Sequence, residues 1–228
     1  MPLSIEPPYF QSGTWGDVAE RKLQEDEKKL SKTVDEFMEG KIFSGFIPVM
    51  QTPLVMQLIG AAPYPVEISA KNLQTTLKGK HSNEIDAELF KQLPRAMSNP
   101  LMIFKNRYTG TSRRIVVLVD LKNRFGANIV VPLELSIDSH EKKYKINRII
   151  DPFGRMDKNV NTPSYDWFAE RVESKSVLYI NKKRTSQWLR SEPPDWLLPD
   201  KSKKGLSLTI DEKKILSIRE RRIFKDYR

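Results

Sequence analysis

The sequence predicts an α+β domain in which N-terminal helices pack on a four- to five-stranded antiparallel sheet, followed by a basic C-terminal helix. Two patterns support this fold class. Apolar residues recur with helical spacing up to about residue 94, and β-branched runs bounded by turn residues follow between residues 101 and 150. Because the connections between these runs are short, we expect neighbouring strands to form an antiparallel meander.

The helical half begins with an amphipathic segment from Asp17, a favourable N-cap, to Gly40, a favourable C′ residue. Shorter helices are expected at 52–60, where Thr52 is the predicted cap, from Ser69, and from Asn83 to the residues before Pro94. Between them, residues 61–69 are expected to be extended, since their prolines disfavour helical backbone in the preceding residue.

The second half predicts strands, followed by helices near the C-terminus. The expected strands cover residues 101–106, 114–121, 128–135, 143–150 and 176–181, and the expected helices cover residues 164–173, 182–190 and a basic amphipathic segment from 209. We therefore divide the chain into an arm and acidic helix (1–45), a main α+β domain (46–200), and a basic linker with the C-terminal helix (201–228).

Composition excludes several classes of protein. Among 228 residues there is no cysteine, which excludes disulfides, thiolate metal sites and cysteine nucleophiles, and there are only two histidines. We expect no metal and no cofactor. No segment approaches the about 20 apolar residues of a membrane span, and the N-terminus lacks a secretory pattern, so we expect no membrane contact and a cytoplasmic location.

The net charge of +10 favours a polyanionic partner, of which nucleic acid is the usual example. Acidic residues outnumber basic ones in the first 40 residues, so the rest of the chain is more basic than the total suggests. The alternative is a basic protein whose charge serves solubility alone.

The segment LKGKHSNEID is the densest candidate for chemistry. Lys78, Lys80 and His81 lie in a glycine-containing loop before a predicted helix, where lysines hold phosphate and a histidine exchanges protons near neutral pH. The alternative is a solvated basic loop. The other histidine, His140, is expected to be exposed and inert.

A second group of cations decorates the predicted sheet. Basic and aromatic side chains on one sheet face suit single-stranded RNA, because charge attraction and base stacking add. The alternative is the ordinary alternation of polar residues on an exposed face. The candidates are Lys105, Arg107, Arg148 and Arg155 with Tyr179, and the tetrad NKKR, which contains Asn181, Lys182 and Lys183.

The order of several segments resembles a known family. TPLVMQLIGAAPYPVEISAKNLQTTLKGKHS, LPRAMSNPLMIFKNR, YKINRIIDPFGR and SVLYINKKRTSQWL are similar to the phage-associated nucleases of the barnase–EndoU–colicin–RelE (BECR) superfold. They resemble in particular the C-terminal domain of MuF-type head-morphogenesis toxins and phage polyvalent proteins. The resemblance extends over about residues 46–198.

This resemblance implies a metal-independent endoribonuclease of toxin type, in which the ribose 2′-OH attacks the adjacent phosphate and leaves a cyclic phosphate. It implies RNA, with tRNA among the candidates, as substrate, and an immunity or antitoxin protein as partner. It also implies delivery into a target cell or association with a virion. By position, the family's motifs fall on Lys80, His81, Asn147, Gly154, Arg155, Tyr179, Lys182 and Lys183; Lys80, His81, Arg155 and Tyr179 are the implied catalytic residues.

One departure from the family pattern keeps other functions open. Relatives tend to have a serine and then a tyrosine before the glycine–basic pair, whereas this chain has Asp151 and Phe153 in DPFGR. Loss of a hydroxyl and gain of a carboxylate are expected to change or weaken the chemistry. The alternatives are therefore a non-catalytic nucleic-acid-binding module and a virion-associated interaction domain on the same fold.

Overall fold

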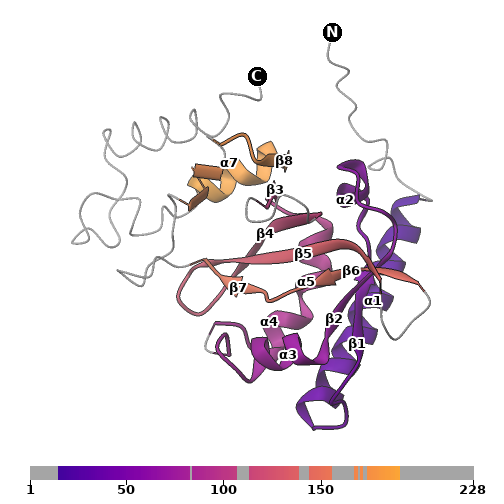
Figure 1. Ribbon diagram of the computed structural model, residues 1–228. Helices are drawn as coiled ribbons and strands as arrows, with labels where there is room; N and C mark the ends of the chain where they lie inside the picture. Colours follow the sequence, from indigo (N-terminus) through magenta and orange to yellow (C-terminus); the bar gives the residue numbers. More distant parts are fainter. Residues whose placement is uncertain are drawn as a thin grey trace.

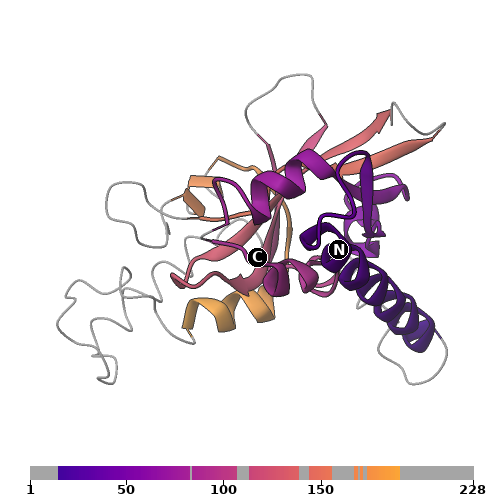
Figure 2. The same ribbon diagram turned by 90° about the horizontal axis from the view of Figure 1, so that it is seen from below.

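The computed structural model describes residues 15–82, 84–106, 113–138, 144–155, 167–168, 170–171 and 174–190. Within them, helices lie beside a mixed β-sheet (Figures 1 and 2). The arm, the predicted C-terminal helix and most of the helix expected at 164–173 lie outside the described residues. None of the described helices is long and apolar enough to cross a bilayer.

The long helix α1 (Trp15–Met38) packs against the sheet and the short helices through one apolar stripe. Leu30, Val34 and Phe37 are buried at helical spacing and belong to the main core. The backbone of Gly40 has φ +77°, and its N–H donates to the Phe37 carbonyl at 3.1 Å. The predicted C′ role of Gly40 is thereby confirmed, because a left-handed backbone ends a helix at low cost only in glycine.

Four short helices follow: α2 (Leu54–Leu58), α3 (Ala70–Leu77), α4 (Ala87–Lys91) and α5 (Leu93–Ser98). The Ser69 hydroxyl caps α3, as expected. Asp86 caps α4, so this helix begins later than the predicted start at Asn83. Pro94 lies in the first turn of α5, where a missing N–H costs nothing, and therefore begins a helix instead of ending one. Thr52 does not cap α2, because its hydroxyl donates to the Tyr64 carbonyl.

The strands form one eight-stranded sheet, which is larger than the expected four or five strands. They are β1 (Phe46–Gln51), β2 (Pro65–Ser69), β3 (Met102–Lys105), β4 (Arg114–Lys122), β5 (Asn128–Asp138), β6 (Lys145–Ile149), β7 (Phe153–Gly154) and β8 (Val177–Ile180). The order is β1-β2-β6-β5-β4-β3-β8, with β7 beside β5. The expected meander of β3 to β6 is confirmed, but β2 and β6 are parallel, so the sheet is mixed.

Sequence reasoning missed the two-residue strand β7 and, at the edge of the sheet, β1. Its pairing with β2 shifts register between Pro48 and Met50. Proline has no N–H to donate to a ladder and is confined to edges and bulges. A short run interrupted by proline gives little period-2 signal, which explains the omission.

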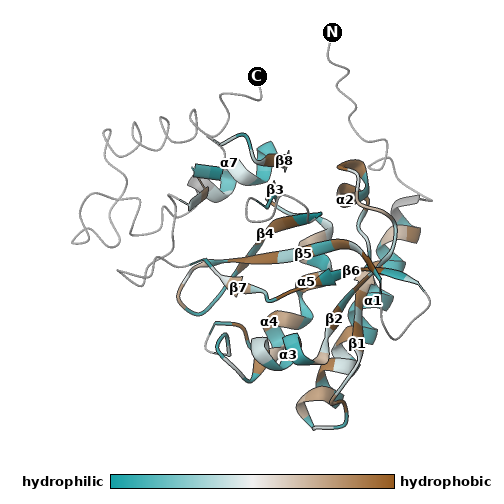
Figure 3. Cartoon of the chain, in the orientation of Figure 1, coloured by the Kyte–Doolittle hydropathy of each residue, from teal (hydrophilic) through white to brown (hydrophobic). Residues whose placement is uncertain are grey.

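The two faces of the sheet build two cores. Ile103, Val117 and Val131 belong to the main core under α1 and the short helices, whereas Phe104 and Val116 belong to a second core on the opposite face. The second core also includes Phe168 and contacts Trp188 of α7 (Lys182–Arg190). Figure 3 shows apolar residues along the central strands β4 and β5.

The chain after β6 positions the candidate site. β6 and β7 pair with the same side of β5, and Asp151 and Pro152 form the break between them. β7 therefore continues the line of β6 along β5. The loop that leaves α3 lies against this continuation, as the contacts below show.

Candidate functional site

Two segments far apart in the sequence meet beside β7. The imidazole of His81 stacks on the Phe153 ring with a centroid distance of 5.6 Å and an interplanar angle of 21°. The Lys80 Nζ lies 3.5 Å from the Asp151 Oδ2. The structure therefore brings the Lys80–His81 motif against DPFGR.

Glu84 joins the same two segments. Its Oε2 accepts the Gly154 N–H at 2.7 Å, and its Oε1 lies 3.6 Å from the His81 Nδ1. The His81 side chain is 14% exposed, and its Nδ1 is buried. With Nδ1 directed at a carboxylate, the Nε2 atom is the one left to face a substrate. At 3.6 Å the carboxylate lies on the Nδ1 side of the ring but is too distant for a hydrogen bond.

The turn between β4 and β5 approaches β7 closely at Gly154. A Cβ on Gly154 would lie 2.1 Å from the Asn123 Nδ2, so only glycine fits there. The Asn123 Oδ1 accepts the N–H groups of Phe125 and Ala127 at 3.0 and 2.9 Å. Asn123 thus shapes the β4–β5 turn and anchors it beside the site.

Three buried polar atoms around this point have no hydrogen-bond partner: the His81 Nδ1, the Asn123 Nδ2 and the Asp151 Oδ1. Native proteins pair nearly all buried polar groups, and the exceptions call for a functional or strain explanation. All three atoms belong to residues that contact β7 or lie just before it in the sequence. We therefore take the surroundings of β7 as the candidate functional site.

Arg155 adds a cation at the end of β7. Its N–H donates to the Asn128 carbonyl at 3.0 Å, which extends the β5 ladder by one residue. Its guanidinium carbon lies 4.8 Å from the centre of the Trp167 ring, and that of Arg171 lies 4.9 Å from the same ring. Trp167 packs edge-on against Phe104. The aromatic cluster of the second core therefore fixes Arg155.

Tyr179 and the NKKR tetrad lie at the opposite edge of the sheet, as Figure 1 shows for β8 and α7. Four strand-to-strand steps separate β8 from β7, which at about 4.8 Å each amounts to roughly 19 Å. Burial raises the pKa of Tyr179, although a hydrogen bond with Asn181 and the charge of Arg184 counteract it. Asn181 caps the first turn of α7 by accepting the Arg184 N–H. Lys182 and Lys183 are exposed.

Two predicted RNA-binding residues hold the fold together. The Lys78 Nζ donates to the Phe37 and Met38 carbonyls, each at 3.3 Å, and so caps the C-terminus of α1. Asn147 is fully buried, and its Nδ2 donates to the Thr52 Oγ1 at 2.8 Å and the Ala62 carbonyl at 2.9 Å. These contacts orient both side chains toward the protein.

Arg148 is engaged on the sheet face that carries the second core. Arg114, Glu134 and Arg148 stand opposite one another on β4, β5 and β6, and both guanidinium groups bind the Glu134 carboxylate. Burial raises the pKa of Glu134, but the hydrogen bonds from Arg148 and Arg114 outweigh it and hold that pKa below its usual value. Glu134 is therefore a cross-strand partner of two arginines.

The remaining sequence candidates are dispersed. Lys105 is exposed at the end of β3, and its N–H donates to the Ser176 carbonyl at 2.7 Å. Arg107 and His140 lie outside the described residues. Glu84 and Asn123 were not singled out, although Glu84 belongs to the LKGKHSNEID segment, three residues after His81. Asn123 gave no signal beyond turn chemistry.

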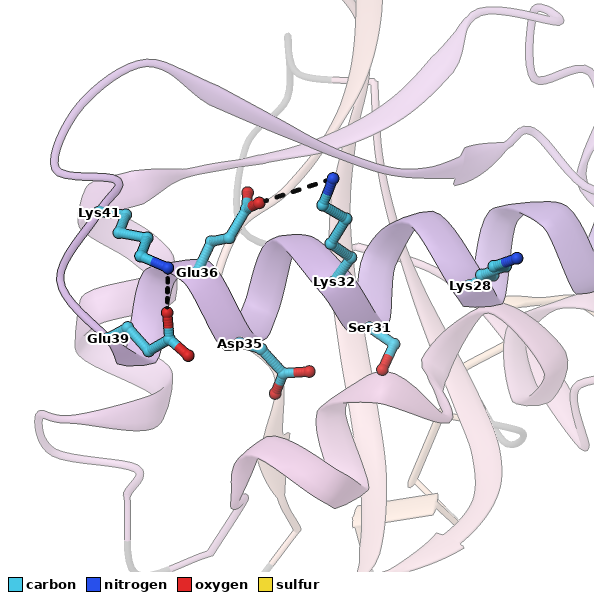
Figure 4. A pocket seen from close by; sticks show the side chains of 7 residues that line it. All are labelled: Lys28, Ser31, Lys32, Asp35, Glu36, Glu39 and Lys41. Carbon is cyan, nitrogen blue, oxygen red and sulfur yellow. Dashed lines mark ion pairs between the residues drawn. The ribbon is translucent and has the colours of Figure 1, made fainter.

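A surface pocket lies elsewhere, along α1 (Figure 4). Its lining contains no aromatic or histidine side chain, and the charges pair with one another, as Lys41 does with Glu39 at 2.5 Å. The lining residues are Lys28, Ser31, Lys32, Asp35, Glu36, Glu39 and Lys41. The chemistry-bearing residues gather at β7 and not here. In the described part of the chain, no three acidic or histidine side chains are grouped so as to hold a metal ion.

Comparison with protein families identifies the chain's relatives. The model of the phage MuF-C-terminal domain matches residues 74–187, half of the chain. The chain belongs to this family. In this MuF-C-terminal domain, the matched segment contains the loop after α3, all strands from β3 to β8, and every residue of the candidate site. Comparison with curated proteins and with solved structures gave no match.

Proposed function

We propose that this MuF-C-terminal domain is a metal-independent endoribonuclease on a BECR-type fold. The observation that supports the proposal is the convergence of Lys80, His81 and Glu84 on residues 151–154, which directly precede Arg155. RNA, including tRNA, is the proposed substrate. An immunity or antitoxin protein is the proposed partner, and the membership of a phage family supports delivery into a cell or association with a virion.

Cleavage of this kind needs proton transfer and charge stabilisation, and no metal. The 2′-oxygen forms a bond to phosphorus while the bond from phosphorus to the 5′-oxygen breaks. One group removes the 2′-OH proton, another protonates the leaving 5′-oxygen, and cations stabilise the extra negative charge on the phosphorane.

The site supplies one proton-transfer group and two cations, so the second proton is exchanged with solvent. His81 is the proposed proton-transfer group, acting through Nε2, and Glu84, whose Oε1 lies 3.6 Å from Nδ1, is the proposed positioning residue. Lys80, whose side chain is 64% exposed, and Arg155 are the proposed phosphate contacts. Because the Gly154 N–H donates to Glu84, the pair formed by His81 and Glu84 is connected to the backbone of β7.

The full-length protein tests the proposal directly. RNA and DNA of the same sequence are incubated with it, each with and without EDTA. We expect EDTA-resistant cleavage of RNA to a cyclic phosphate and no cleavage of DNA, which lacks the attacking hydroxyl. Cleavage of DNA, or cleavage of RNA that EDTA abolishes, would contradict the mechanism.

The two histidines of the chain offer a matched pair of variants. His81→Ala is expected to lower RNA cleavage about 10²-fold or more, the usual effect of removing a general acid or base. His140→Ala is the control and is expected to leave cleavage unchanged. Equal activity of the two variants would remove His81 from the mechanism.

A second candidate function is a non-catalytic nucleic-acid-binding module, associated with the virion. The observation in its favour is Asp151, whose carboxylate lies beside Lys80 where a phosphate would otherwise be received. RNA binding without cleavage, unaffected by His81→Ala, would support this candidate and exclude the nuclease.

A further inference from the structure

The turn between β4 and β5 presents an aromatic ring beside the candidate site. Phe125 is 42% exposed, although most large apolar side chains in the described part of the chain are covered. The guanidinium carbon of Arg124 lies 4.8 Å from the centre of the Phe125 ring. The Phe125 ring and the Arg124 guanidinium are therefore available for contact with a ligand.

This turn is held in place, and its position is tied to β7. The Phe125 N–H donates to the Asn123 Oδ1 at 3.0 Å, and Gly126 has φ +80°. Asn123 is 4% exposed and packs so closely on Gly154 that no Cβ fits between them. Gly154 directly follows Phe153, on which His81 stacks. Phe125 thus lies two residues from Asn123, and Asn123 packs against Gly154 at the proposed cleavage site.

We propose that the β4–β5 turn is a nucleobase subsite, in which Phe125 stacks on a base of single-stranded RNA next to the cleaved phosphate and Arg124 contacts the backbone. The inference deepens the proposed function by naming the part of the substrate that is recognised. Any base presents a face for stacking, so an aromatic ring with an adjacent cation binds single strands with little sequence preference. The net charge of +10 favours a polyanionic occupant over an apolar peptide.

Binding to a non-cleavable oligonucleotide separates this inference from catalysis. The probe is a short single-stranded 2′-O-methyl RNA whose affinity for the full-length protein is measured by fluorescence anisotropy. Phe125→Ala is expected to weaken binding about tenfold, because stacking of one base is worth about 1–3 kcal/mol. Phe125→Trp keeps an aromatic ring and is expected to bind as tightly as the wild type. The Trp variant also provides a fluorescence signal that a stacked base quenches.

Two controls identify the cause of any loss. Phe43→Ala removes another exposed aromatic ring, 82% exposed in the loop before β1, and should leave affinity unchanged. An oligonucleotide with abasic sites should bind the wild type and Phe125→Ala equally, since it offers no base to stack.

Each outcome has a distinct meaning. Wild-type binding that Phe125→Ala weakens supports the subsite, even if RNA is not cleaved and the nuclease proposal fails. Affinities of the wild type and Phe125→Ala within twofold of each other would overturn the subsite, even if RNA is cleaved. Absence of wild-type binding would also overturn it.

Discussion

The Glu84 carboxylate accepts the Gly154 N–H at 2.7 Å across 70 residues of sequence. This hydrogen bond connects the loop after α3 to the strand that continues β6. The same carboxylate faces His81, so the orientation of the imidazole depends on the backbone at β7. Substitutions that displace β7 should therefore change the site without removing any of its side chains.

Gly154→Ala tests this dependence. Its Cβ would meet the Asn123 Nδ2 at 2.1 Å, and relief requires that the Asn123 side chain, which accepts two N–H groups of the turn, or β7 moves. We expect a loss of stability of about 1–3 kcal/mol, typical of overpacking, measured by urea denaturation.

The double variant Gly154→Ala/Asn123→Ala provides the control, because it removes the clashing amide. The two substitutions share a contact and should be non-additive, with the double variant more stable than the sum of the single effects predicts. Strict additivity would show that the close approach of Gly154 and Asn123 is not the cause.

Glu134→Gln tests the ion pairs between β4, β5 and β6. At neutral pH, loss of the carboxylate leaves Arg114 and Arg148 without their shared partner. Both guanidinium groups are about one-third exposed, so the expected cost is about 1–3 kcal/mol, below that of a fully buried pair. Glu36→Gln, at an exposed pair of 3.9 Å with Lys32, is the control and should cost almost nothing.

The pH dependence of the Glu134 effect follows from the direction of its pKa shift. Because the folded-state pKa is lowered, the stabilisation is complete above the ordinary value of 4.5 and is lost as the pH falls through the folded-state pKa. The wild type and Glu134→Gln should therefore differ in urea midpoint at pH 7 and converge once the pH falls below the folded-state pKa of Glu134. A difference that stays constant with pH would contradict the assignment.

Tyr179→Phe tests the implied catalytic tyrosine. Because β8 lies four strands from β7, the phenol is placed far from His81. We expect RNA cleavage to change less than about twofold, whereas a proton-transfer group would lower it about 10²-fold. A large loss of activity with unchanged thermal stability would mean that the substrate bridges both edges of the sheet.

Sequence reasoning identified the elements better than their arrangement. The period-2 runs predicted β3 to β6 and β8, because strands with buried faces carry a strong local signal. The parallel contact between β2 and β6 was not predictable in this way. It joins residues 66–68 with residues 147–149, and local patterns contain no information on which distant strands pair.

For the site as well, sequence reasoning identified residues but not the contacts between them. Lys80 and His81 were recognised from their chemistry and loop position, and Arg155 from a motif. Their convergence, and the parts of Glu84 and Asn123 in it, depend on tertiary contacts between distant segments. Lys78 and Asn147 matched the expected residue types but contact backbone carbonyls of the protein itself, which only the three-dimensional structure can reveal.

Asp151→Asn tests whether the departure from the family pattern restrains RNA binding. In the structure the Asp151 carboxylate lies 3.5 Å from the Lys80 Nζ and competes with any phosphate for that cation. The neutral amide removes this competition while keeping the shape of the side chain. Affinity for the 2′-O-methyl oligonucleotide should therefore rise several-fold. The slope of log affinity against log salt should steepen by about 0.7, the contribution of one additional phosphate contact on a single strand.

Lys80→Gln in the Asp151→Asn background is the control for this prediction. It removes the cation that the substitution is expected to release, so the gain in affinity and the steeper salt slope should both disappear. If Asp151→Asn leaves affinity and slope unchanged, Lys80 does not contact phosphate. The cationic contribution at β7 would then have to come from Arg155 alone among the proposed phosphate contacts.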